Sequence, residues 1–344
     1  MENRRIGDGS PAFVVAEAGV NHNGDLDLAR RLIDAAADAG ADAVKFQTFR
    51  TDALVTADAP KAGYQAETTG AGGQRAMLAR LELTADAHAG LRDRSHTRGL
   101  VFFSAPFDEA SADLLERVGV PVFKVPSGEI TNFPLLRHVA AKGRPLILST
   151  GMSTIDEVDR AVETVRAAGD PPLALLHCVS AYPAPAAETN LRAIDALRAR
   201  FGCPVGLSDH TLGTAVAIAA VARGVAIVEK HLTLDKTLPG PDHRASLDPV
   251  EFGALMRAIR EVESALGDGN KRPMPSEADT RRVARKSLVA ARPIKAGERL
   301  SASDVAVKRP GTGLAPGELP RVLGRALRRD LAADELISWE ALAP

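Results

Sequence analysis

Eight short apolar segments, each followed by a segment of helical character, are the feature that most constrains the fold of this chain. They are Phe13–Ala16, Ala43–Phe46, Leu100–Phe103, Val122–Val125, Leu146–Leu148, Leu173–Leu176, Val205–Leu207 and Ala226–Val228. Strands that alternate with helices are typical of a parallel sheet with crossover helices, and eight such units close a barrel. The sequence therefore predicts an α/β fold, a (β/α)₈ TIM barrel. The alternative is a doubly wound open sheet, but no Gly-x-Gly-x-x-Gly turn follows the first strand.

The helical segments are rich in Ala, Leu and Arg with apolar residues at helical spacing. They are Leu28–Ala39, Ser111–Val118, Ile155–Ala167, Leu191–Ala199, Thr214–Ala222 and Val250–Leu266. Glycines close several of these segments, as expected at helix ends: Gly40, Gly119, Gly169 and Gly224.

The pattern ends near residue 267. Residues 267–277 are rich in Gly, Asn, Lys and Pro and are typical of a linker. From about residue 283 the chain has short apolar segments and tight turns without a long helix. We therefore expect a catalytic barrel over residues 1–267, a linker over 268–282 and a small β-rich domain over 283–344.

Composition excludes several classes of partner. The 43 Lys and Arg nearly balance the 44 Asp and Glu, which argues against a nucleic-acid-binding surface. No segment is long and apolar enough to span a bilayer, and residues 1–10 lack the apolar core of a signal peptide. The two cysteines, Cys178 and Cys203, have no metal-type spacing. We expect a cytoplasmic protein with no disulfide framework, no nucleic acid partner and no membrane partner.

Polar and charged residues collect where the apolar segments end, which in a parallel barrel is the rim of the active site. They are Glu17, Lys45, Gln47, Ser104, Lys124, Ser127, Glu129, Ser149, Thr150, His177, Asp209, His210, Glu229, Lys230 and His231. A structural protein would not normally gather so much charge at one rim.

Two of these groups indicate chemistry. His210 and His231 follow adjacent closing strands, which favours a divalent metal over two unrelated core histidines. Lys45 and Lys124 point into a barrel interior, where a lysine is costly unless an anion pairs with it. We therefore expect a phosphate or carboxylate ligand, although salt-bridged packing is the alternative.

Other polar residues have equally good structural explanations. Ser127 and Ser149 could simply cap helices. His22 and Asn23 could shape the turn before Gly24. We interpret His177 and Cys178 as structural.

The motifs then show a resemblance that runs nearly end to end. "AEAGVNHNGD", "VKFQTF", "FFSAPFD", "FKVPSGEITNFPLL", "ILSTGMST", "LLHCVSAYPAP", "GLSDHTLG", "EKHLT" and "GPDH" resemble the sialic acid synthase (N-acetylneuraminate synthase) family. The segment that contains "VKRPGTGLAP" resembles the antifreeze-like SAF domain of that family. The resemblance implies a transferase that condenses phosphoenolpyruvate with an open-chain 2-acetamido mannose-type sugar, adds water and releases phosphate.

The resemblance also implies roles for individual residues. The metal pair is His210 and His231, usually with Mn²⁺, and with Mg²⁺ or Co²⁺ as alternatives. The positions that hold phosphoenolpyruvate are Lys45, Lys124, Ser127, Ser149 and Ser208. The positions around the N-acetylated amino sugar are Glu17, Gln47, Tyr182 and Asp242. Arg309 matches an arginine that the SAF domain of a partner inserts over the sugar, which implies a homodimer with swapped caps.

Residue types at these positions fit general acid–base and electrostatic catalysis. We expect Glu129 to position or deprotonate the attacking water, with Glu17 as the second candidate. Lys45 and Lys124 would supply fixed positive charge around the phosphate. Together with Glu17 and Glu129 they form the predicted catalytic set.

The acceptor sugar and two other classes of function stay open. Residues 61–83 and "VPSGEITN" resemble the N,N'-diacetyllegionaminate synthase branch more than the N-acetylneuraminate branch, and a pseudaminic acid synthase is a further alternative. This resemblance favours 2,4-diacetamido-2,4,6-trideoxymannose as the acceptor. A Schiff-base aldolase that uses Lys45 or Lys124, or a non-catalytic sugar-binding protein, would belong to a different class.

Overall fold

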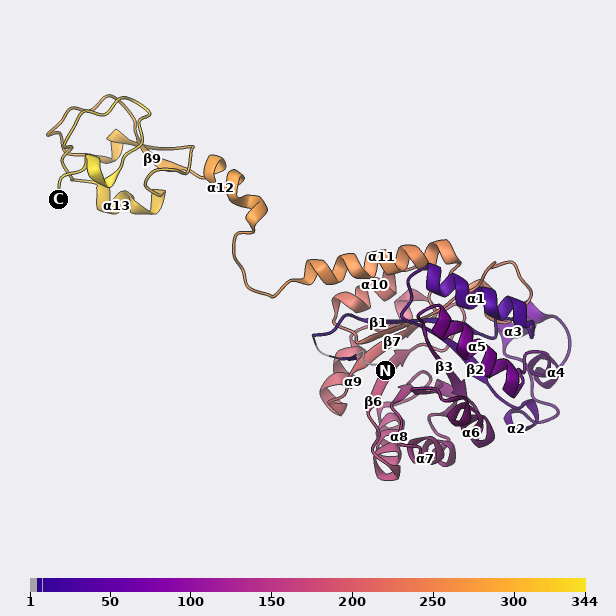
Figure 1. Cartoon of the computed structure of the whole chain (residues 1–344). Helices are drawn as coiled ribbons and strands as arrows, with labels where there is room; N and C mark the ends of the chain where they lie inside the picture. The colour runs from indigo at the N-terminus through magenta and orange to yellow at the C-terminus, as the bar shows by residue number, and fades with distance from the viewer. Residues whose placement is uncertain (1–4, 8) are drawn as a thin grey trace. The chain divides into compact units, whose positions relative to one another are not determined.

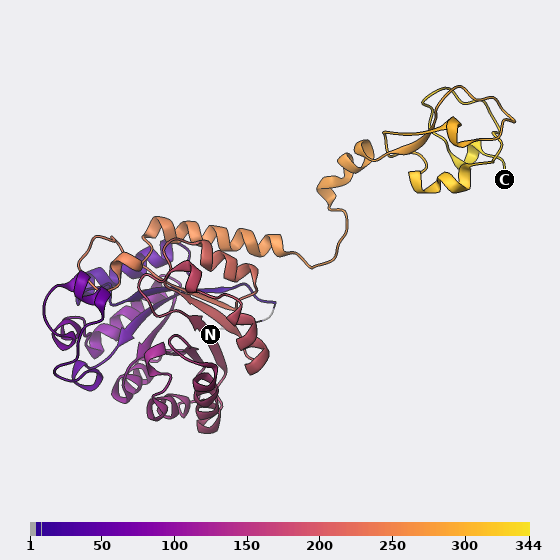
Figure 2. The ribbon, with the colours of Figure 1, turned by 180° about the vertical axis from the view of Figure 1, so that it is seen from behind.

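The computed structural model describes residues 5–7 and 9–344, and the chain forms two compact units, residues 1–267 and 268–344. Figure 1 shows the whole chain, and Figure 2 shows it from behind. Each unit is described by itself.

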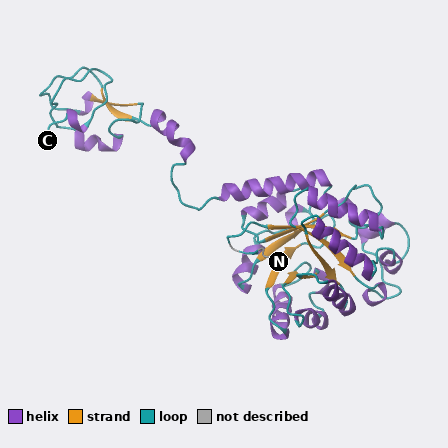
Figure 3. Ribbon diagram, viewed as in Figure 1, coloured by secondary structure: helices purple, strands orange, loops and turns teal. Residues whose placement is uncertain are grey.

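The first unit is the predicted eight-stranded parallel barrel. Its strands are β1 (Phe13–Gly19), β2 (Ala43–Thr48), β3 (Val101–Pro106), β4 (Phe123–Val125), β5 (Leu146–Ser149), β6 (Leu173–Cys178), β7 (Val205–Asp209) and β8 (Ile227–His231). Neighbouring strands pair in the order β3-β2-β1-β8-β7-β6-β5-β4, and β3 contacts β4 to close the ring. Figure 3 shows the strands in orange within a layer of purple helices. The prediction of a TIM barrel is confirmed.

The helices around the barrel are α1 (Leu26–Asp38), α5 (Ala85–Thr97), α6 (Glu109–Val118), α7 (Phe133–Ala140), α8 (Ile155–Ala168), α9 (Ala193–Phe201), α10 (Ala215–Ala222) and α11 (Pro249–Leu266). In α1, the Asp25 side chain caps the first turn, while Leu32, Ile33 and Ala36 share the buried face. Both α5 and α7 lie outside the segments predicted as helices, because α5 has a weak apolar stripe and α7 is only two turns long.

The connection between β2 and β3 is unusually elaborate, since three short helices precede α5. They are α2 (Thr51–Leu54), α3 (Gly63–Thr69) and α4 (Gln74–Ala79). This segment has a small apolar core of its own, formed by Val20, Phe49, Met77 and Leu81. A separate core holds these helices over one side of the barrel rim.

The second unit contains α12 (Ala278–Ala284), β9 (Ser287–Ala290), β10 (Val305–Lys308) and α13 (Leu319–Val322). The two strands pair antiparallel, and Leu288, Ile294, Leu300 and Ile337 are among the residues of its core. Helix α12 begins inside the segment expected to be a linker. A turn in which the Met274 N–H donates to the Glu277 carboxylate at 2.7 Å starts this helix.

Among the described residues, no helix combines the length and the apolar character that crossing a bilayer requires.

Candidate active site

Every site residue predicted for the barrel lies on the wall of one cavity of about 520 Å³ at the carboxyl ends of the strands. The lining set includes Glu17, Lys45, Gln47, Lys124, Ser127, Glu129, Ser149, Tyr182, Ser208, His210, His231 and Asp242. Arg309 lies in the second unit, where its Nε donates to the carbonyl oxygen of Ala284 at 3.1 Å. The residues predicted from the ends of the apolar segments therefore lie together at one cavity, although this pattern does not by itself assign the role of each side chain.

The ionic floor of this cavity consists of Glu17, Lys45, Lys124 and Glu229, all buried. Lys45 Nζ lies 2.6 Å from Glu17 Oε2 and 3.7 Å from Glu229 Oε2. Lys124 Nζ lies 3.0 Å from Glu229 Oε1. Two lysines thus face two carboxylates, as the salt-bridged alternative anticipated, and an incoming anion would have to share these ammonium groups.

Burial and mutual attraction set the protonation of the ionic floor. Burial acts to raise the pKa of Glu229, but Lys124 and Lys45 overcome it and hold this pKa below its usual range. Burial raises the pKa of Glu17 in spite of the adjacent Lys45. Glu229 is therefore the fixed counter-ion, and Glu17 is the carboxyl that can carry a proton near neutral pH.

Serine side chains line the same part of the cavity. Ser208 Oγ donates to Glu229 Oε1 at 3.0 Å, and Ser127 Oγ accepts from the Gly151 N–H at 2.9 Å. Ser149 Oγ is buried and makes no hydrogen bond to a described residue. An unsatisfied buried hydroxyl on the wall of the cavity that also contains Lys45 and Lys124 could bind a ligand oxygen.

His210 and His231 face each other, with ring centroids 5.3 Å apart. His210 Nδ1 lies 2.8 Å from the Val179 carbonyl oxygen, so it carries the proton and leaves Nε2, which lies 3.5 Å from Ser208 Oγ, as the nitrogen with a lone pair. His231 Nδ1 is buried without a hydrogen bond to a described residue, and burial together with His210 lowers the pKa of this imidazole well below its usual value. Burial acts to lower the pKa of His210, but Cys178 and the Val179 carbonyl outweigh it and raise this pKa above its usual value. A divalent cation would bind both imidazoles in their neutral form.

Among residues 5–7 and 9–344, no group of three or more His, Cys, Asp or Glu forms a closed metal site. Asp242 Oδ2 lies 3.9 Å from His231 Nδ1. A cation held by the two imidazoles would keep other coordination positions for water and substrate, which is typical of catalytic rather than structural sites.

Charged residues beside the histidines point to the other side of the sheet. Lys230 is fully buried, and its Nζ donates to Asp209 Oδ2 at 2.8 Å and to the Thr211 carbonyl oxygen. Asp209 Oδ1 accepts in turn from the Thr211 N–H at 2.9 Å. Side chains alternate along a strand, so this outer pair joins β7 to β8 at the residues next to His210 and His231. The pair therefore fixes the spacing of the two imidazoles.

The predicted sugar-site residues surround the histidines. The Tyr182 ring lies 4.1 Å from the His210 ring and 5.8 Å from the His231 ring, measured between centroids. Gln47 Nε2 donates to Glu17 Oε1 at 3.2 Å. Burial raises the pKa of Asp242 to about 6, with His210 and Lys45 opposing the rise.

Glu129 follows β4 and lines the cavity. Its Oε2 accepts from Asn132 Nδ2 at 2.7 Å, and burial raises its pKa in spite of that bond. A carboxyl with a raised pKa at the edge of a cavity can take a proton from water.

The sequence analysis missed several cavity residues. Cys178, which it treated as structural, lines the cavity with Sγ 3.8 Å from His210 Nδ1. Glu229 was noted at a strand end but not assigned, although it lies two residues before His231 and so shares its inward direction. Tyr64, on α3, stacks on Tyr182 at 5.1 Å and had no recognisable signal.

The structural interpretations of His22 and His177 agree with the geometry. His22 is buried, and its Nδ1 accepts from the Gly24 N–H at 3.0 Å within the turn after β1. His177 Nε2 lies 2.6 Å from the Thr189 carbonyl oxygen.

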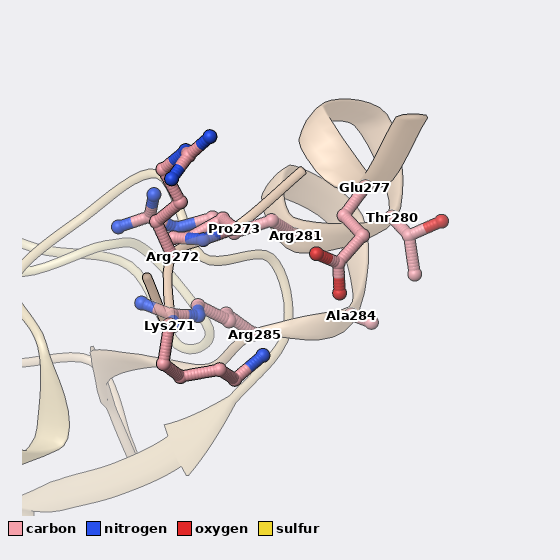
Figure 4. A pocket seen from close by; sticks show the side chains of 8 residues that line it. All are labelled: Lys271, Arg272, Pro273, Glu277, Thr280, Arg281, Ala284 and Arg285. Atoms are coloured by element: carbon pink, nitrogen blue, oxygen red, sulfur yellow. The ribbon is translucent and has the colours of Figure 1, made fainter. Parts of the chain in front are cut away.

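A separate cavity of about 430 Å³ lies in the second unit, beside α12. Figure 4 shows its basic side chains, which come from Lys271, Arg272, Arg281 and Arg285. All of its polar and charged lining residues are exposed, so this cavity lacks the buried polar groups of the barrel site. The barrel cavity is the candidate active site.

Known proteins match both units of the chain. The model of the NeuB family matches residues 32–271, and that of the SAF domain matches residues 285–343. The chain is 45% identical to an N,N'-diacetyllegionaminic acid synthase of Legionella pneumophila over 98% of both chains. It is 44% identical to a synthase of the same name from Campylobacter jejuni, over 94% of this chain and 98% of the relative.

A solved structure is also similar. The N-acetylneuraminic acid (sialic acid) synthetase of Leptospira borgpetersenii, in complex with citrate, superposes with a TM-score of 0.71 at 36% identity. The match covers 81% of this chain and 93% of that one.

Proposed function

The chain belongs to the NeuB family, and we propose that it is a nonulosonic acid synthase that uses phosphoenolpyruvate and an open-chain 2-acetamido mannose-type sugar. The best candidates are N,N'-diacetyllegionaminate and N-acetylneuraminate synthase. The observation that carries the proposal is one cavity in which two buried lysines, a cluster of serines and a histidine pair lie together.

The proposed reaction forms one carbon–carbon bond and breaks one carbon–oxygen bond. C3 of phosphoenolpyruvate attacks the sugar aldehyde, whose oxygen takes a proton and becomes a hydroxyl. Water adds its oxygen to C2 of the former phosphoenolpyruvate and releases a proton. The bond from C2 to the phosphate oxygen then breaks, which leaves a 2-keto acid and inorganic phosphate.

The ionic floor would bind phosphoenolpyruvate. Lys45 and Lys124 are preorganised by Glu17 and Glu229, so their charges need little rearrangement when the phosphate and carboxylate arrive. The unsatisfied Ser149 hydroxyl, together with Ser127 and Ser208, would donate hydrogen bonds to the ligand oxygens.

Two carboxyls are placed to handle protons. Glu129, with its raised pKa, would position the attacking water and accept its proton. Glu17, hydrogen-bonded to Gln47 and paired with Lys45, is the second candidate and could exchange a proton with the sugar oxygen. Tyr182 and Asp242 would hold the sugar beside the histidines.

His210 and His231 would hold the metal, for which Mn²⁺ is the first candidate, with Mg²⁺ or Co²⁺ as alternatives. When bound, such a cation acts as a Lewis acid on a carbonyl oxygen. The Val179 carbonyl supports this role because it fixes the His210 tautomer.

A direct test measures phosphate release from phosphoenolpyruvate with N-acetylmannosamine, 2,4-diacetamido-2,4,6-trideoxymannose and the 2,4-diacetamido sugar of the pseudaminate branch. We expect the trideoxymannose to have the highest kcat/KM. Sodium borohydride provides the second arm, since trapping of substrate on Lys45 or Lys124 would indicate the Schiff-base aldolase instead. No phosphate release with any sugar would refute the proposal.

We further propose a cytoplasmic homodimer in which the SAF domain of one copy caps the barrel of the other. Residues 268–344 carry 15 basic and 10 acidic side chains, whereas residues 1–267 carry 28 and 34. Opposite net charge supports association of a cap with a barrel. In this arrangement Arg309 would reach over the sugar.

A mixing experiment tests the swapped cap. Arg309→Ala and His231→Ala are each expected to be inactive alone. A mixed dimer pairs the intact barrel of one chain with the intact cap of the other, so about a quarter of wild-type activity should return after subunit exchange. Verified exchange without any recovery would contradict a shared site.

A further inference from the structure

Asp242 differs from most other charged residues of the cavity in how its backbone is held. Lys45, Ser208 and Glu229 belong to strands β2, β7 and β8, so the sheet fixes their positions. Asp242 lies instead in the connection between β8 and α11, outside any strand. It is nevertheless buried, with its Oδ2 3.9 Å from His231 Nδ1. Contacts outside the sheet must therefore place this carboxylate in the cavity.

A buried serine holds the main chain of Asp242. Ser246 Oγ donates to the Asp242 carbonyl oxygen at 2.7 Å. The next residue, Leu247, runs beside the end of β8: its N–H donates to the His231 carbonyl oxygen at 2.9 Å, and its carbonyl oxygen accepts from the Thr233 N–H at 2.9 Å. The hydroxyl that holds Asp242 is thus tied to the strand that carries His231.

Asn21, which follows β1, joins this serine to the barrel. Its Nδ2 donates one hydrogen bond to Ser246 Oγ and a second to the Leu232 carbonyl oxygen, both at 2.9 Å. Asn21 is only 1% exposed, so bulk water does not compete for these bonds. A primary amide supplies two N–H donors from one nitrogen, which serine and ionised aspartate do not. A continuous hydrogen-bonded path therefore leads from Asn21 through Ser246 to Asp242.

The other side of the same connection is held independently. His243 Nδ1 lies 2.7 Å from Thr233 Oγ1, and its Nε2 lies 3.3 Å from Asn23 Oδ1. Packing here is close, since a Cβ added at Gly240 would lie 2.6 Å from His243 Cδ2. Loss of the Ser246 hydroxyl should therefore shift Asp242 without releasing the whole connection.

We propose that Asn21 and Ser246 are positioning residues for the acceptor sugar, because they hold the Asp242 carboxylate in the cavity beside His231. This inference rests on the proposed function, in which Asp242 contacts the sugar. Neither Asn21 nor Ser246 is among the described residues that line the cavity, so both act through Asp242 and not by touching a substrate.

The first test compares Ser246→Ala with Ser95→Ala in the full-length protein, with 2,4-diacetamido-2,4,6-trideoxymannose as the acceptor. Ser95 on α5 is also buried and donates to a backbone carbonyl, that of Leu91 at 2.8 Å, but does not line the cavity. Ser246→Ala should lower kcat/KM for the sugar about 3- to 10-fold, the size expected for one buried hydrogen bond, and leave the KM for phosphoenolpyruvate unchanged. Ser95→Ala should lose similar stability and change neither constant.

A double-mutant cycle with Asp242→Ala separates positioning from an independent effect. When the carboxylate is absent, adding Ser246→Ala should cause no further loss of kcat/KM for the sugar. A repeat of the full single-variant loss would overturn the inference. Calorimetric binding of the sugar gives the same comparison where turnover is too slow to measure. Asn21→Ala removes both N–H donors, should follow the same pattern and covers the case in which Ser246→Ala does not fold.

The remaining outcomes are distinguishable. Wild-type kinetics in folded Ser246→Ala and Asn21→Ala would overturn the positioning role and leave the synthase activity in place. An equal loss for the sugar and for phosphoenolpyruvate would also overturn it, because a general structural role affects both substrates. No phosphate release by the wild type with any acceptor sugar would instead refute the proposed function, and this inference with it.

Discussion

The ionic floor shares its cavity with an apolar wall of Leu54, Val55, Leu78 and Phe107, but the two are built in different ways. The ionic floor is made of strand residues that are almost fully buried and paired with opposite charges. The apolar wall comes largely from short helices between β2 and β3, whose side chains are half-buried around a separate small core. A rigid floor suits the reaction steps that are common to every acceptor sugar. A wall on a separate segment can differ in sequence between enzymes with different acceptors without disturbing those steps.

This contrast makes a general prediction about variants. Changes to Lys124 of the ionic floor or to the histidine pair should lower turnover of every sugar by the same factor. Changes to the apolar wall should alter the ratio between sugars.

The largest effect is expected for His231→Ala. Loss of one of the two imidazole ligands should abolish metal retention and activity with every acceptor sugar. The measurement is metal content by mass spectrometry and activity after chelation and return of Mn²⁺. His96→Ala, on the surface of α5, is the control for loss of a histidine. Full activity of chelated wild type or of His231→Ala would contradict a metal site here.

Lys124→Met should have the next largest effect. It removes a buried cation and leaves Glu229 short of its closer partner, so binding of phosphoenolpyruvate should weaken by about 2–5 kcal/mol. Steady-state kinetics should show a higher KM for phosphoenolpyruvate, with the ratio of kcat/KM between the acceptor sugars unchanged. Lys295→Met in the second unit, with its side chain 78% exposed, is the control. An altered sugar ratio would break the separation of floor from wall.

Lys230→Met tests the outer pair that supports the histidines. The change leaves Asp209 buried beside an apolar group, which should lower the free energy of unfolding by about 3 kcal/mol and weaken metal binding. Urea denaturation and calorimetric metal titration measure the two effects. The double variant Lys230→Met, Asp209→Asn removes the unpaired charge and should recover part of the stability. If it recovers none, the two side chains are not coupled.

The smallest effect concerns the turn after β1. Burial lowers the pKa of His22 to about 4, from an ordinary value of 6.5. As the pH falls from 6.5 to 4, the unfolded chain takes up a proton that folded His22 resists, so stability should decrease, by up to about 3 kcal/mol. His22→Asn keeps an acceptor for the Gly24 N–H without this titration. Its unfolding free energy should depend less on pH over that range, and an unchanged slope would show that His22 does not contribute.

The position of a residue at the end of an apolar segment predicted some site residues and failed to distinguish others. It found His210, His231, Lys45 and Lys124 because the end of an apolar segment is a local pattern. It did not separate Asp209 and Lys230, which face outward, from the inward residues beside them. Alternation along each strand contains that information, and applying it would also have placed Glu229 in the cavity.

By itself, the sequence determined the eight-stranded barrel, the break near residue 267 and the strand ends that carry the predicted site residues. It could do so because the spacing of apolar residues and the ends of apolar segments are properties of neighbouring residues. Only the tertiary structure decided which distant groups meet. Lys124 pairs with Glu229 across 105 positions of sequence, and Tyr64 reaches Tyr182 from a different connection of the barrel. Such contacts depend on how the strands close and how the short helices pack over the rim, and no local pattern in the chain specifies that geometry.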